Sequence, residues 1–193
     1  SSESIKDCIG GVILYDETIR QNDINGVPFI NLLKTKNIHP GIKVDGGVTA
    51  LAGSETEKIT EGLDNLEKRI EEYSKMGATF TKWRAVINIG EQIPTNYCIE
   101  LHAHALARYS RIVQKYNMVP IVEPEIIMDG SHDIGECYQV TNNTLKIVFE
   151  HLKFQGVYLG GILLKPNMVI SGTNCKKQAD INEVSMMTIK CLE

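Results

Sequence analysis

The chain has 193 residues, of which 42% are hydrophobic and 23% are charged, values close to those of an average globular domain. This length predicts one domain, and the composition excludes collagen, a coiled coil and a disordered tail. The net charge of −4 gives no indication of nucleic-acid binding, and every apolar run is far shorter than the ~20 residues of a membrane-spanning helix.

Short apolar segments, taken in chain order, predict five β-strands. They cover residues 11–15, 41–45, 80–87, 119–126 and 158–165. Between the strands, apolar residues recur every three or four positions, the pattern of an amphipathic helix. The clearest series begin at Leu63, Ile99 and Leu145. Alternating strands and helices predict βαβ units around a parallel sheet with right-handed crossovers.

Five parallel strands fit either a doubly wound sheet or part of a (β/α)8 barrel, and charged residues decide between them. Strands of a parallel sheet are covered on both faces and are expected to be apolar. Four of the predicted strands nevertheless carry charges, in three of them at positions i and i+2, which share a face. The charged residues are Lys43, Asp45, Lys82, Arg84, Glu123, Glu125 and Lys165.

Burying an unpaired ion costs several kcal/mol, so we expect these side chains to share one polar cavity. In a barrel the inward side chains converge at the carboxyl ends of the strands, whereas a doubly wound sheet would spread them across about 15 Å. The sequence therefore predicts a (β/α)8 barrel.

The cysteines and histidines give no metal-binding pattern. The five cysteines are an odd number without C-x-x-C spacing, which predicts free thiols in a reducing cytoplasm. His102 and His104 lie two apart, so on a helix they point to different faces and are expected to be ordinary surface histidines. The first residues, Ser-Ser-Glu-Ser, do not resemble a signal peptide. We expect no metal and no cofactor.

Lysines beside carboxylates in a cavity suit Schiff-base chemistry. A lysine amine becomes nucleophilic when desolvation or a neighbouring cation favours its neutral form. A carboxylate can then move the protons, and further cations suit a phosphorylated substrate. Lys165 follows an apolar run and precedes Pro166, so we expect it to be the nucleophile, with few routes to bulk water. The alternative is a strand-end lysine that points into solvent.

The other charged residues also have structural alternatives. Glu123 and Glu125 flank Pro124 and could be loop carboxylates. Lys82 and Arg84 could form structural ion pairs with these glutamates, which is compatible with catalysis.

Several segments together resemble the class I fructose-1,6-bisphosphate aldolases. They are Gly10-Gly11-Val12-Ile13-Leu14, Gly41-Ile42-Lys43-Val44-Asp45, Gly62-Leu63-Asp64, Lys82-Trp83-Arg84, Val122-Glu123-Pro124-Glu125-Ile126 and Leu163-Leu164-Lys165-Pro166-Asn167-Met168. The match runs in order and without gaps from about Cys8 to the end. The resemblance implies a (β/α)8 barrel that reversibly cleaves fructose 1,6-bisphosphate, without metal, in glycolysis and gluconeogenesis.

The resemblance implies a catalytic role for four residues. Lys165 would be the Schiff-base lysine, and Glu123 the main general acid and base. Glu125 would position and tune the lysines, and Lys82 would contact substrate and assist Lys165.

Four further residues would bind substrate or support the site. Lys43 and Arg84 would be active-site cations, Asp45 would belong to the same polar network, and Asn167 would support the Lys165 loop. One departure is Gly46-Gly47, where the family commonly has Lys-Gly.

The resemblance covers the second to the sixth barrel strand. We therefore expect residues 1–193 to form a single barrel domain of about five β/α units, incomplete at both ends. The expected partner is a sugar phosphate, with no nucleic acid and no membrane, and the family suggests a homotetramer. A catalytically inactive fragment or a non-catalytic interaction module is the alternative. A weaker alternative is another Schiff-base barrel enzyme such as a transaldolase, because the segments Lys82-Trp83-Arg84 and Glu123-Pro124-Glu125 argue against it.

Overall fold

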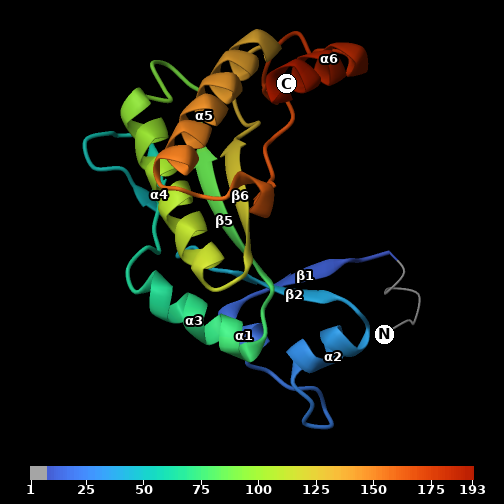
Figure 1. The fold of residues 1–193 in the computed structure, drawn as a ribbon. Helices are drawn as coiled ribbons and strands as arrows, with labels where there is room; N and C mark the ends of the chain where they lie inside the picture. Colours follow the sequence, from blue (N-terminus) through green and yellow to red (C-terminus); the bar gives the residue numbers. More distant parts are fainter. Residues whose placement is uncertain (1–7) are drawn as a thin grey trace.

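Five parallel strands form one sheet whose order follows the order of the chain (Figure 1). The structure is a computed structural model that describes residues 8–193, so the segment that bears on a signal peptide lies outside it. The strands are β1 (Gly11–Leu14), β2 (His39–Lys43), β5 (Phe80–Ile87), β6 (Val119–Ile126) and β7 (Leu163–Leu164). The order β1-β2-β5-β6-β7 has no reversal point, which a doubly wound sheet requires.

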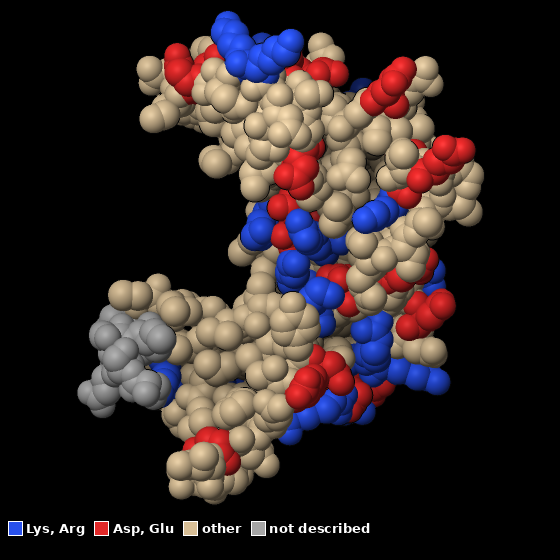
Figure 2. Space-filling view, turned by 180° about the vertical axis from the view of Figure 1, so that it is seen from behind, with Lys and Arg blue, Asp and Glu red and all other residues tan. Residues whose placement is uncertain are grey.

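The first five helices lie between strands in the chain, and the sixth follows the last strand. They are α1 (Asp16–Ile19), α2 (Phe29–Thr35), α3 (Leu66–Met76), α4 (Asn96–Lys115), α5 (Ile134–Phe154) and α6 (Ile181–Leu192). In Figure 1, α4 and α5 lie along one face of β5 and β6. The opposite face borders a deep hollow, which Figure 2 shows from behind. No helix in residues 8–193 has the length and apolar character needed to cross a bilayer.

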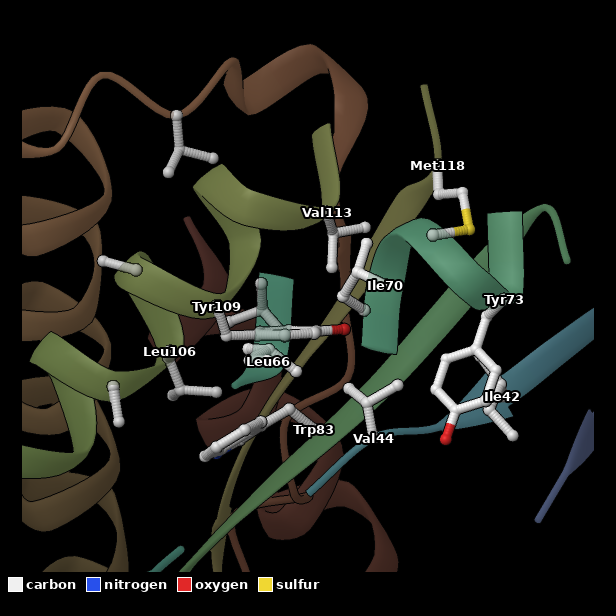
Figure 3. Close-up of a cluster of buried hydrophobic side chains, with 14 of the residues drawn as sticks. Ile42, Val44, Leu66, Ile70, Tyr73, Trp83, Leu106, Tyr109, Val113 and Met118 are labelled. Atoms are coloured by element: carbon white, nitrogen blue, oxygen red, sulfur yellow. The ribbon is translucent and has the colours of Figure 1, made fainter. Parts of the chain in front are cut away.

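Residues of β5 alternate between the two faces of the sheet. Thr81, Trp83, Ala85 and Ile87 are buried toward the helices, whereas Lys82 and the other alternate residues are partly exposed. Figure 3 shows the buried side: Trp83 lies beside Tyr109 of α4, with side chains of α3 close by. The centroids of the two rings are 5.5 Å apart. Packing on one face and charge on the other follow from the two-residue period of a strand.

The long helices α4 and α5 both begin at side-chain caps. Thr95 Oγ1 accepts a hydrogen bond from the Cys98 amide (3.1 Å), and Asp133 Oδ1 accepts one from the Glu136 amide (2.8 Å). Such caps satisfy amide groups that have no partner within the helix. They fix where each helix starts on the sheet.

Two short strands and one helical turn differ from the sequence prediction. The antiparallel pair β3 (Val48–Ala50) and β4 (Lys58–Thr60) was not predicted, because three-residue strands carry no readable period. Of residues 158–165, only Leu163–Leu164 forms a strand, after the 3-10 turn η2 (Leu159–Gly161). The side chain of Gln114 bonds the backbone of Tyr158 there, in place of a strand ladder.

The prediction of a surface position is wrong for His102. Its side chain is 1% exposed, and Nε2 lies 3.0 Å from the carbonyl oxygen of Lys58. Since β4 packs against α4, this face of the helix is covered. Burial lowers the pKa of His102, which keeps the ring neutral. His104 is exposed, as predicted.

We expect Tyr109→Phe to lower the free energy of unfolding by about 1–3 kcal/mol. The Tyr109 hydroxyl lies 2.6 Å from Thr81 Oγ1, and both residues are fully buried, so the change leaves a buried hydroxyl without its partner. Urea unfolding followed by circular dichroism measures the loss. Tyr116→Phe is the matched control, because its hydroxyl bonds only the exposed Glu67 at 3.3 Å. Equal losses in the two variants would contradict the prediction.

Candidate active site

Charged side chains line the face of the sheet that borders the hollow. Strand register places Lys43 opposite Lys82, and Arg84 opposite Glu123. Figure 2 shows basic and acidic residues gathered on the inner wall of the hollow. Lys43, Lys82, Arg84 and Glu123 therefore lie on neighbouring strands, near the carboxyl ends.

Glu123 lies between two lysines. Lys165 Nζ donates a hydrogen bond of 2.7 Å to Glu123 Oε1, and Lys82 Nζ lies 3.0 Å from Oε2 as an ion pair. The Glu123 side chain is only 4% exposed, and that of Lys82 is 17% exposed. A buried carboxylate needs such cationic partners. The contact also brings the predicted nucleophile within proton-transfer distance of the predicted acid and base.

Lys165 is more open to solvent than predicted. Its amide donates to the Val122 carbonyl at 2.9 Å, which fixes its backbone, but its side chain is 56% exposed. The expectation of few routes to bulk water is wrong for the described residues. The reason is that β7 has two residues and lies at the edge of the sheet, so only β6 flanks it there.

The other charged residues form two further ion pairs. Lys43 Nζ lies 2.5 Å from Asp45 Oδ1, and Arg84 pairs with Glu125. Asp45 is buried and also accepts hydrogen bonds from the amides of Gly47 (3.2 Å) and Arg84 (3.5 Å). Glu125 thus contacts a different cation from Glu123, and no ion pair in residues 8–193 joins it to a lysine.

Asn167 ties the segment after Lys165 to the sheet. Its Oδ1 accepts from the Ile126 amide at 3.0 Å, and its Nδ2 donates to Thr141 Oγ1 at 3.2 Å. This geometry fits the expected support of the Lys165 loop. Thr141 of α5 was not predicted, since a threonine within a helix carries no sequence signal for such a contact.

Neither Tyr15 nor Tyr109 was predicted to lie near the charged residues. Lys43 Nζ lies 5.9 Å from the centre of the Tyr15 ring, and Tyr109 packs behind β5 and β6. Burial raises the pKa of Tyr109, so its hydroxyl stays protonated.

Within residues 8–193, no three His, Cys, Asp or Glu side chains converge in a way that could hold a metal ion.

Parallel strands in sequence order, with helices on one face and lysine–glutamate pairs at their carboxyl ends, define part of a (β/α)8 barrel. The family model described as Glycolytic: Fructose-bisphosphate aldolase class-I matches residues 1–193. The chain belongs to the class I fructose-bisphosphate aldolase family.

Individual relatives agree with this assignment. The chain is 54% identical over 193 residues to a probable fructose-bisphosphate aldolase class 1 of Xanthomonas axonopodis pv. citri, covering all of the chain and 58% of that protein. It is 47% identical over 192 residues to fructose-bisphosphate aldolase C of Homo sapiens, covering all of the chain and 53% of that protein. The chain therefore spans a little over half the length of these relatives.

A solved structure gives the same fold. The fructose-bisphosphate aldolase of Plasmodium falciparum, solved with TRAP and a small-molecule inhibitor, superimposes with a TM-score of 0.94 at 45% identity. The match covers 97% of this chain and 55% of the other. The prediction of a partial (β/α)8 barrel is confirmed.

Proposed function

We propose that this chain carries the Schiff-base centre of an aldolase that reversibly cleaves fructose 1,6-bisphosphate to dihydroxyacetone phosphate and glyceraldehyde 3-phosphate. The observation that carries the proposal is the buried Glu123 between Lys82 and Lys165. A carboxylate 2.7 Å from a lysine amine can take up and return the protons of imine chemistry.

The covalent steps begin at Lys165. Its neutral amine attacks the C2 carbonyl carbon, and the carbonyl oxygen takes up a proton to give a carbinolamine. Glu123, as an acid, protonates the departing hydroxyl, so water leaves and a protonated imine remains. Lys82 places a second positive charge beside the Glu123 carboxylate.

Cleavage then uses the protonated imine as the electron acceptor. A base removes the proton of the C4 hydroxyl, the C3–C4 bond breaks, and its electrons move into the imine to form an enamine. Glyceraldehyde 3-phosphate leaves, and a proton returns to C3. Water then hydrolyses the imine, which releases dihydroxyacetone phosphate from Lys165. The water released in the first half is consumed in the second, so Lys165 is restored.

The remaining charged residues suit the phosphates of the substrate. Arg84 and Lys43 lie on the same face as Lys165, and cations bind phosphate through charge-assisted hydrogen bonds. Asp45 and Glu125 hold these cations in place.

A cytoplasmic homotetramer acting in glycolysis and gluconeogenesis is part of the same proposal. The family resemblance supports the tetramer and the pathway. The cysteines support a reducing compartment, because all five are free.

Borohydride trapping tests the proposed function. The protein, expressed from its complete gene, is mixed with dihydroxyacetone phosphate and sodium borohydride, and the adduct is mapped by mass spectrometry. Hydride reduces the imine to a stable secondary amine, so we expect one adduct, on Lys165. An adduct on Lys43 would contradict the choice of nucleophile. No adduct would contradict the function and favour a non-catalytic interaction module.

A further inference from the structure

Arg84 lies on β5 beyond the point where the neighbouring strand β2 ends. The paired residues of the two strands run from Gly41 with Phe80 to Lys43 with Lys82, and the Val44 amide still donates to the Lys82 carbonyl at 3.1 Å. On this side, the backbone of Arg84 therefore needs partners other than a strand.

Two side chains supply these partners. Thr60 Oγ1 donates a hydrogen bond of 2.8 Å to the Arg84 carbonyl oxygen, and Asp45 Oδ2 lies 3.5 Å from the Arg84 amide. Thr60 is buried at the end of β4, and the carboxylate of Asp45 is buried as well. Together the two side chains replace the backbone hydrogen bonds that a longer β2 would make with Arg84.

The β3–β4 hairpin that carries Thr60 is anchored to the end of β2. The Gly46 amide donates to the Glu61 carbonyl (2.8 Å), and the Glu61 amide donates to the Gly47 carbonyl (2.9 Å). Arg69 of α3 donates from Nη1 to the Val44 carbonyl at 2.8 Å. The segment that presents Asp45 is thus held from both sides.

The other end of the hairpin is anchored to α4. The carboxylate of Glu57 accepts from the Thr95 amide (2.7 Å) and the Thr95 hydroxyl (2.8 Å), at the N-cap of that helix. His102 Nε2 lies 3.0 Å from the carbonyl of Lys58, two residues before Thr60. Anchored to the end of β2 and to α4, the hairpin holds the Thr60 hydroxyl at a defined position.

We propose that Thr60 is a positioning residue that fixes the backbone of Arg84, so that its guanidinium pairs with Glu125 and faces the substrate. This inference rests on the proposed function, in which Arg84 binds a substrate phosphate. Glu123 lies on β6 and Lys165 follows β7, so both lie on the side of β5 opposite to β2. Their contact with each other does not involve the β3–β4 hairpin. Thr60 therefore governs substrate affinity and leaves the covalent steps unchanged.

The test compares Thr60→Val, which removes the hydroxyl at nearly constant volume, with Thr60→Ser, which keeps it. Loss of about one hydrogen bond corresponds to a roughly three- to tenfold change in binding. We expect Thr60→Val to raise KM for fructose 1,6-bisphosphate by about this factor, with kcat within about twofold and Lys165 trapping unchanged. Thr60→Ser should restore KM.

Thr49→Val is the matched control, because Thr49 lies on β3 of the same hairpin and its hydroxyl bonds the exposed Glu61 at 3.3 Å. An unchanged KM in a folded Thr60→Val, or an equal rise in Thr49→Val, would overturn the inference. If Thr60→Val does not fold, Thr60→Ala is measured instead and judged by the same criteria.

The wild-type protein separates this inference from the proposed function. A wild type that neither cleaves substrate nor traps on Lys165 contradicts both. An active wild type with an unchanged KM in the Thr60 variants contradicts the inference alone.

Discussion

Lys165→Arg should abolish borohydride trapping and lower the rate of cleavage by at least ~10⁴-fold, as expected for loss of a covalent nucleophile. A guanidinium remains protonated and cannot attack a carbonyl, although it keeps the positive charge beside Glu123. The fold should persist, because the side chain is half exposed and the backbone contact to Val122 does not involve it. Mass spectrometry of the trapped protein and steady-state kinetics measure the two effects.

Lys43→Arg is the matched control for this substitution. It preserves a cation next to Asp45 on the same face of the sheet. The adduct should still form on Lys165 in this variant. Trapping that survives Lys165→Arg but disappears in Lys43→Arg would show that Lys43 is the nucleophile.

Glu123→Gln should lower kcat by about 10²–10⁴-fold, the usual range for a positioned acid and base. The amide fills the same space between Lys82 and Lys165 but cannot exchange protons. Attack by the amine needs less help than the later proton transfers, so the carbinolamine or imine should accumulate. Rapid-quench measurement of the covalent intermediate, set beside the rate of product formation, shows which step has slowed.

Glu125→Gln is the comparison, with the same substitution on the same face of β6. Its carboxylate pairs with Arg84, so the change should raise KM with little accumulation of intermediate. The assignments would be reversed if Glu125→Gln stalled cleavage after trapping and Glu123→Gln did not.

The core of the fold follows from local sequence patterns. The predicted limits of β5 and β6 agree with the structure, because both are long strands of eight residues, and β5 also alternates clearly between buried and partly exposed residues. In β5 and β6 the charges at i and i+2 also lie on one face, since that period is a property of any strand. The predicted strand 41–45 is wrong in its limits, because β2 covers His39–Lys43 and Asp45 lies beyond its end. Helices α3, α4 and α5 overlap the predicted apolar series, because apolar residues every three or four positions form one face of a helix.

The features that could not be predicted depend on contacts between distant segments. Burial of His102 and the contact of Thr60 with Arg84 both require the β3–β4 hairpin, whose three-residue strands have no readable pattern. Which carboxylate pairs with which cation depends on strand register and twist, so the contact of Glu125 with Arg84 was not predictable from spacing. The exposure of Lys165 depends on what flanks β7.

The alternation along β5 also sorts inherited variation at this strand into two kinds. A substitution at Trp83 or Ala85 disturbs packing against the helices, so it reduces the amount of folded protein in the cell. A substitution at Arg84 changes a partly exposed group that faces the hollow, so we expect it to leave abundance high and to lower the proposed activity. Neighbouring positions of one strand would then give two kinds of variant: chaperones or low temperature would rescue the first kind but not the second.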